Sequence, residues 1–193
     1  MEYLAKNKEI ILNRQVNELD QFVLDFCSLL KEYVVVSGYV SILLGRSRAT
    51  EDVDLLLPAF QKEEFYVLWD SILSQRFECL NTSKKEEAFE MLPHHAIRFS
   101  RKGQPLPNME FKIMKRSLDF YAYDNKIKVK IGNNSLYISP LEMQIAYKLF
   151  LGSDKDIEDA RHLYKFFKDK LNKEELLSAC MKLSVMEKRG LLE

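Results

Sequence analysis

Apolar side chains recur at steps of three and four in two stretches of the chain, and this spacing predicts amphipathic helices. The first stretch is 14–32, with Val16, Leu19, Phe22, Val23, Phe26, Leu29 and Leu30 on one face. The second is 60–75, with Phe60, Phe65, Leu68, Trp69 and Ile72 on one side. Residues 79–92 are rich in charge and fit no period.

Short β-branched or alternating runs predict strands between these helices. The run "DVDLLLP" is closed by Pro58, and residues 39–45 can form a short helix before it. Gly and Pro in "RKGQPLPN" predict a turn between two strands, and "GNN" predicts a hairpin turn. The predicted strands are residues 33–37, 52–57, 95–100, 109–114, 126–131 and 135–139.

From residue 139 the pattern changes to helices with clear start signals. Each signal is a capping residue with an acid three positions later: Ser139 with Glu142, Ser153 with Asp156, and Asn172 with Glu175. Pro140 strengthens the first, and Gly190 stands where the last helix is expected to end. We therefore predict an α+β fold, with a mixed domain over 1–138 and a helical C-terminal subdomain over 139–193 packed on it.

Composition narrows the class of protein. The chain is 47% hydrophobic and 30% charged, as in an ordinary globular domain. Lys plus Arg (29) equals Asp plus Glu (29), so no overall field favours nucleic acid. The three cysteines lack paired spacing, which argues against a disulfide framework or a zinc site and suits a cytoplasmic protein. No apolar run reaches the roughly 18 residues of a membrane span.

Asp52 and Asp54 carry the first chemical signal. Alternate residues of a strand share a face, so both carboxylates project the same way, about 6–7 Å apart at the Cα atoms. Like charges this close call for a cation or a shared proton. The pair suits Mg²⁺ or Mn²⁺, and two such ions can stabilise the attacking and leaving oxygens of phosphoryl transfer. A solvated strand end is the alternative explanation of the pair.

Glu110 is the candidate third carboxylate. It lies in the predicted strand "MEFKIM" between Met109 and Phe111, where a charged residue is unexplained as core. The alternative is an acid on an edge strand that faces water.

Ser37 and Gly38 are candidate phosphate contacts. They follow one predicted strand and precede a short helix, and glycine allows backbone N–H groups to approach phosphate oxygens. Arg46 and Arg48 fall on the return to the next strand and could reach a triphosphate. Both arginines could instead pair with Glu51 or solvate a loop.

These residues together resemble the nucleotidyltransferase superfamily that includes DNA polymerase β. Its signature is a Gly-Ser or Gly-Gly turn, a helix, then Asp-x-Asp/Glu on the next strand and a third acid on a later one. More narrowly, "GRSRATEDVD", "PNMEFKIMK" and "SPLEMQIAYKLFLGSDKDIEDARHL" resemble abortive-infection-type toxin nucleotidyltransferases and related archaeal proteins. The turn here is Ser-Gly-Tyr and the third acid is Glu, and both depart from the commoner pattern.

The resemblance implies a polymerase β-like mixed sheet flanked by helices. It implies that Asp52, Asp54 and Glu110 bind metal and that Glu110 serves as base for the attacking hydroxyl. It also implies that Lys148 and Asp156 line the nucleotide site. From the residues alone, Lys148 could be a snorkelling side chain and Asp156 a helix-capping acid.

The expected function is a metal-dependent nucleotidyltransferase, the catalytic domain being 1–138. It would transfer NMP from an NTP to an acceptor hydroxyl on tRNA, other RNA or protein. The resemblance implies that such an enzyme is the toxin of a toxin–antitoxin pair and has a cognate antitoxin. The alternative is a non-catalytic nucleotide-binding or antitoxin-like module of the same fold. The sequence does not select the base, the acceptor or the oligomeric state.

Overall fold

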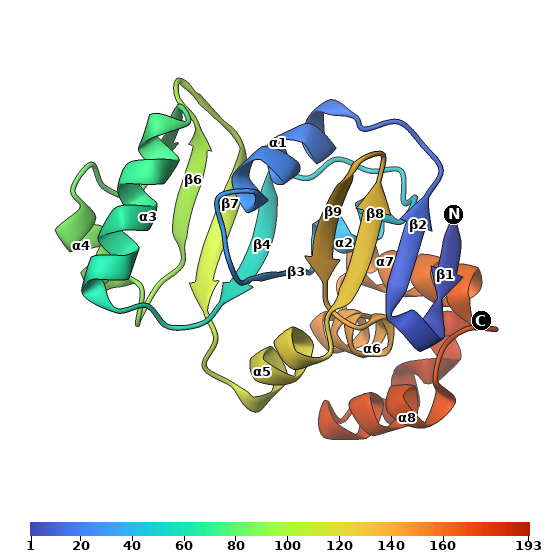
Figure 1. Ribbon diagram of the computed structural model, residues 1–193. Coiled ribbons are helices and arrows are strands. Elements are labelled where there is room, and N and C mark those ends of the chain that lie inside the picture. Colours follow the sequence, from blue (N-terminus) through green and yellow to red (C-terminus); the bar gives the residue numbers. More distant parts are fainter.

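The computed structural model describes residues 1–193 and is built on one nine-stranded mixed sheet (Figure 1). The strand order is β1-β2-β8-β9-β3-β4-β7-β6-β5. The strands are β1 (Glu2–Leu4), β2 (Glu9–Leu12), β3 (Val34–Val36), β4 (Asp52–Leu57), β5 (Phe77–Cys79), β6 (Ile97–Arg101), β7 (Gln104–Ile113), β8 (Ile127–Ile131) and β9 (Asn134–Ile138).

Eight α-helices and two 3₁₀ segments surround the sheet and confirm the α+β class. None of the helices is long and apolar enough to cross a lipid bilayer. The helices are α1 (Glu18–Cys27), α2 (Gly38–Leu43), α3 (Lys62–Ser74), α4 (Lys85–Met91), α5 (Ser117–Asp124), α6 (Leu141–Leu151), α7 (Asp154–Phe167) and α8 (Lys173–Lys182), with η1 (Ala5–Asn7) and η2 (Met186–Leu192).

The middle of the sheet positions the site. Strand β4 runs antiparallel to β3 and parallel to β7, and Asp54 is in register with Glu110. Because side chains alternate across a strand, Val53 and Leu55 point into the core, and both are fully buried. Asp52 and Asp54 are therefore on the opposite face of β4, as predicted.

Two hydrophobic clusters pack the two faces of this central region. The larger has 46 buried residues and includes members from both sides of the predicted boundary at residue 138, such as Val129 and Ile145. The smaller has five: Val34, Leu56, Met114, Ala122 and Met143. The smaller cluster joins β3 and β4 to α5 and α6, and so places those helices over the acidic face of β4.

The predicted hairpin, the short helix after β3 and the three C-terminal helices are confirmed. Two caps are also confirmed, because the side chains of Ser153 and Asn172 accept hydrogen bonds from backbone N–H groups of α7 and α8. The strands at 33–37 and 52–57 and the helix at 60–75 are present with small shifts of their ends.

Several predictions about local structure are wrong. Strands β1 and β2 at the start of the chain were not predicted. The helix predicted over 14–32 is present as α1, but it begins only at Glu18, because Asn17 caps it with its side chain. Helix α5 was not predicted. The turn predicted in "RKGQPLPN" is present at Lys102 and Gly103 but is shorter than expected, since strand β7 begins at Gln104 and contains the prolines.

Two predictions for the C-terminal part are also wrong: the cap at Ser139 with Glu142, and Gly190 as the end of the last helix. Ser139 makes no capping bond to α6; its hydroxyl instead donates to Gln144. Glu142 accepts a hydrogen bond from the backbone N–H of Asn172, so its carboxylate is used at the start of another helix. Helix α8 ends at Lys182, and Gly190 lies within η2.

Candidate active site

The acids Asp52, Asp54 and Glu110 form a carboxylate row on one face of β4 and β7. Asp54 and Glu110 are joined by a residue that the sequence analysis did not single out. The ammonium of Lys112 contacts Asp54 Oδ1 and lies 2.7 Å from Glu110 Oε2. Arg98 on β6 also donates to Glu110, with Nε 2.8 Å from Oε1. Charges thus alternate across three neighbouring strands.

The charges of the row are not evenly compensated. Burial raises the pKa of Asp54, Lys112 opposes that effect, and the carboxylates of Glu110 and Asp52 add to it. Burial also acts to raise the pKa of Glu110, but hydrogen bonds from Lys112 and Arg98 outweigh it and leave that pKa below its usual range. A further positive charge placed beside the row would therefore stabilise the ionised form of Asp54 more than that of Glu110.

A divalent cation is the expected source of that charge. The carboxylate oxygens of Asp52 and Asp54 are the hard donors that Mg²⁺ prefers, and Asp52 is exposed, with Thr50 as its hydrogen-bond partner. These two residues fit such an ion. The structure contains no cluster of three or more His, Cys, Asp or Glu side chains placed to hold a metal. The ligand set with Glu110 as third member stays a prediction.

The turn between β3 and α2 is conformationally unusual. Ser37 has φ 64° and ψ −135°, a region that L-residues rarely adopt. Gln144 of α6 holds this turn from both sides: its Oε1 accepts from Ser37 N–H at 3.2 Å and its Nε2 donates to Ser37 C=O at 2.5 Å. The same Oε1 accepts from the Ser139 hydroxyl at 2.9 Å. Strain at Ser37 is therefore offset by an amide clamp.

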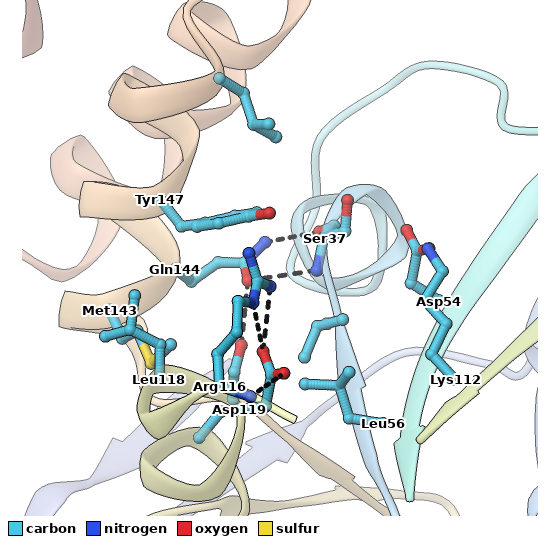
Figure 2. A pocket seen from close by; sticks show the side chains of 14 residues that line it. Ser37, Asp54, Leu56, Lys112, Arg116, Leu118, Asp119, Met143, Gln144 and Tyr147 are labelled. Atoms are coloured by element: carbon cyan, nitrogen blue, oxygen red, sulfur yellow. Dashed lines mark hydrogen bonds and ion pairs between the residues drawn. The ribbon is translucent and has the colours of Figure 1, made fainter. Parts of the chain in front are cut away.

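Ser37 and Asp54 line one cavity of about 250 Å³, shown from close by in Figure 2. Half of its 14 lining residues are hydrophobic. Lys112 and Asp54 lie on one side of it, and Tyr147 and Gln144 of α6 lie across from them. The cavity thus brings Asp54 of the carboxylate row and the Ser37 turn into one lining, which Asp52, Glu110 and Gly38 do not share.

The floor of the cavity carries a second ion pair. Arg116 donates to Asp119 Oδ1 from Nη2 at 3.0 Å, and both side chains are drawn joined in Figure 2. The Arg116 guanidinium also lies 5.9 Å from the ring centre of Tyr147. Because α5 was not predicted, these lining residues were missed; only the Arg-x-x-Asp spacing before an apolar run hinted at them.

The remaining predicted site residues lie outside this cavity lining. Three of them, Arg48, Lys148 and Asp156, form with Asp159 what we term the buried ion network. The Lys148 ammonium is 2.7 Å from Asp156 Oδ1 and 3.0 Å from Asp159 Oδ2. Its side chain is 2% exposed and that of Asp159 is 0% exposed.

Ser153 adds a hydroxyl donor to this network through Asp156. Burial acts to raise the pKa of Asp156, but the hydrogen bonds from Lys148 and Ser153 outweigh it and lower that pKa. Arg46 lies at the margin, with Nε 3.7 Å from Asp159 Oδ1. The predicted nucleotide roles of Arg46, Lys148 and Asp156 stay predictions.

Arg48 connects the network to the turn. Its Nε and Nη2 donate to the two oxygens of Asp159 at 3.0 and 2.8 Å, a two-point pairing that fixes the guanidinium plane. A Cβ on Gly38 would come within 2.7 Å of Arg48 Nη2. A side chain at position 38 would therefore displace the Arg48 guanidinium from its pairing with Asp159, and Arg48 is the predicted arginine that lies beside the turn.

Comparison with known proteins supports the fold. No protein-family model matches the chain, and no curated protein matches it. Among solved structures, the chain is similar to an antigenic nucleotidyltransferase-like protein from Paracoccidioides brasiliensis. The TM-score is 0.56 with 18% sequence identity, over 92% of this chain and 92% of that one. The chain therefore has a nucleotidyltransferase-like fold, and the likeness concerns the fold alone.

Proposed function

We propose that this protein is a metal-dependent nucleotidyltransferase of the polymerase β-like type, which transfers NMP from an NTP to an acceptor hydroxyl. The observation that carries the proposal is the shared cavity of Ser37 and Asp54. The proposal takes Ser37 as a phosphate contact and Asp54 as a ligand of a divalent cation, and two such roles require neighbouring positions. The fold shared with a nucleotidyltransferase-like protein supports the same chemistry.

The nucleoside part of the substrate fits the half-hydrophobic cavity between β4 and α6, and the phosphates point toward the turn and the row. Ser37 offers its hydroxyl, and Gly38, which has no side chain, lets the Arg48 guanidinium approach the turn. Arg48 contributes positive charge beside the turn. These contacts orient the α-phosphate toward the acceptor. Such positioning lowers the entropic cost of bringing the two reacting groups together.

Asp52 and Asp54 are the residues that would hold Mg²⁺ or Mn²⁺. Such an ion, when bound, stabilises negative charge on phosphate oxygens. Glu110 is the proposed base for the acceptor hydroxyl. The hydrogen bonds from Lys112 and Arg98 that lower the pKa of Glu110 also weaken it as a base, so it can accept a proton only once these bonds rearrange.

The proposal also covers the chemical nature of the acceptor and a role as a toxin. By the resemblance, the acceptor is the 3′ end of a tRNA, another RNA, or a protein hydroxyl. A transferase that blocks tRNA in the cytoplasm would act as a toxin and would require a cognate antitoxin.

One observation favours a second candidate, a nucleotide-binding module without turnover. The Ser37 N–H, which a phosphate would otherwise accept from, already donates to Gln144. Nucleotide binding by calorimetry without pyrophosphate release would favour this module.

The deciding experiment is transfer of label from each α-³²P NTP to total RNA or lysate protein, with Mg²⁺ or Mn²⁺ present. The wild-type protein is expected to label one acceptor class, and Asp54→Asn is expected to abolish labelling. Asp169→Asn is the matched control, because Asp169 is exposed and lies between α7 and α8. Labelling by Asp54→Asn at the wild-type rate would overturn the assignment.

A further inference from the structure

Lys112 sits between two carboxylates that come from different strands. Its ammonium contacts Asp54 on β4 and Glu110 on its own strand, and its side chain is 38% exposed. Lys112 also lines the cavity, together with Ser37. It therefore lies where carboxylate oxygens of the two strands converge, in the lining of the proposed nucleotide site.

We propose that Lys112 is a displaceable internal cation. Without ligands it bridges Asp54 and Glu110; a divalent cation that binds Asp54 displaces its ammonium, which then contacts a phosphate of the bound nucleotide. This inference rests on the proposed function, since it assigns Lys112 a place among the substrate contacts.

The neighbours of Lys112 allow this exchange. Glu110 has a second cation, Arg98, so it keeps a partner when the ammonium leaves. Asp54 has no other cation among its ion pairs, so Lys112 and a divalent ion compete for the same carboxylate. A lysine suits this role because its compact charge sits on a flexible four-carbon stem.

The destination of the ammonium is also set by its surroundings. The other cation that lines the cavity is Arg116, and its guanidinium is paired with Asp119. Of the two cations that line the cavity, Lys112 is thus the one whose partner, Asp54, would bind the metal. A phosphate bound in the cavity would then replace Asp54 as the negatively charged partner of the Lys112 ammonium.

The proposal predicts opposite effects on two ligands when the ammonium is removed. Lys112→Met should bind Mn²⁺ about tenfold more tightly, because one competing unit charge is gone. With Mn²⁺ saturating, the same variant should bind nucleotide about tenfold more weakly, because a charged contact to phosphate is gone. A lysine that merely stabilised the strands would not move these affinities in opposite directions.

The test measures Mn²⁺ binding by electron paramagnetic resonance and nucleotide binding by calorimetry with the four α,β-methylene NTPs. Lys102→Met is the matched control, because Lys102 is exposed in the β6–β7 turn, and it should match wild type in both titrations. Lys112→Arg keeps the charge and should hold Mn²⁺ affinity within about threefold of wild type.

Mn²⁺ binding by Lys112→Met no tighter than wild type, or unchanged nucleotide binding, overturns the proposal. Should the Met variant fail to fold by circular dichroism, a clear rise in Mn²⁺ affinity in Lys112→Arg overturns it, and near-wild-type affinity supports it. The Mn²⁺ titration needs no turnover. Absence of label transfer by the wild-type protein would reject the enzyme without deciding Lys112, whereas equal Mn²⁺ affinities would reject Lys112 and leave the enzyme standing.

Discussion

The carboxylate row and the buried ion network use the same residue types in opposite surroundings. In the network, Lys148 is 2% exposed and its two aspartates have further donors in Arg48 and Ser153. In the row, Lys112 is open to a cavity, and Asp54 keeps a raised pKa despite the ammonium beside it.

This difference in burial and pairing indicates that charged residues serve two purposes in this fold, structural stabilisation and ligand binding. A buried pair whose hydrogen bonds are complete stabilises a geometry, and removal of one partner leaves an uncompensated charge. An open and incompletely compensated acid can accept a metal or a proton with little rearrangement. We therefore propose that the row carries the chemistry and that the network, through Arg48, supports the Ser37–Gly38 turn.

The largest expected effect on stability comes from the network. Lys148→Met leaves Asp156 and Asp159 short of a cation inside the protein, so it should lower the free energy of unfolding by about 3–5 kcal/mol. Urea denaturation measures this change. Lys112→Met is the counterpart in the row and should cost less than about 1 kcal/mol. Equal losses in the two variants would remove the distinction between the regions.

Gly38→Ala tests the link between the network and the turn. The new Cβ would meet Arg48 Nη2 at 2.7 Å, and Arg48 is pinned by its two bonds to Asp159. We expect a loss of about 1–3 kcal/mol by thermal or urea unfolding. Gly190→Ala is the control, because no atom lies within 4 Å of its added Cβ. A similar loss at both glycines would argue against the contact.

Ser37→Gly tests the strain at the turn. Glycine adopts the observed φ of 64° without the steric cost that serine bears, so this variant should gain about 1 kcal/mol of stability. Ser37→Ala keeps a Cβ and should show no such gain. Comparable stability of the two variants would mean that the turn is not strained.

The smallest effect is a pH dependence of opposite sign in the two regions. Asp156 has a lowered pKa when folded, so its contribution to stability is present above its unfolded value of 3.8 and is lost as pH falls through the lower folded value. Asp54 has a raised pKa, so the folded protein loses stability as pH rises from 3.8 through the raised value.

Urea denaturation at a series of pH values from about 3 to 7 should show this difference. Asp156→Asn should flatten the acid-side loss, and Asp54→Asn should flatten the loss at rising pH. Changes of the same sign in both variants would contradict the assigned pKa directions.

Local signals in the sequence were sufficient for part of the fold. Three features that depend on neighbouring residues were predicted: the strand with Asp52 and Asp54, the short helix α2 that precedes it, and the caps at Ser153 and Asn172. The cap expected at Ser139 failed because its hydroxyl bonds a tertiary partner, Gln144. Competition from distant partners is not visible in a spacing rule.

The site divides in the same way. Alternation along β4 predicted that Asp52 and Asp54 share a face, but the pairing of Lys112 with Asp54 depends on the register of β7 against β4. The clamp by Gln144 likewise joins residues 107 positions apart in the chain. Such contacts arise only from tertiary structure, so Lys112 and Gln144 were missed although their neighbours were found.

The most direct test of the division between chemistry and stability is one paired measurement on Asp54→Asn. Label transfer from α-³²P NTP and the free energy of unfolding would be measured on the same preparation. We predict loss of transfer with a stability equal to or above that of wild type, because the substitution removes a carboxylate whose ionised form burial disfavours. Retained transfer, or a collapse of stability that accounts for its loss, would contradict the assignment of the chemistry to the carboxylate row.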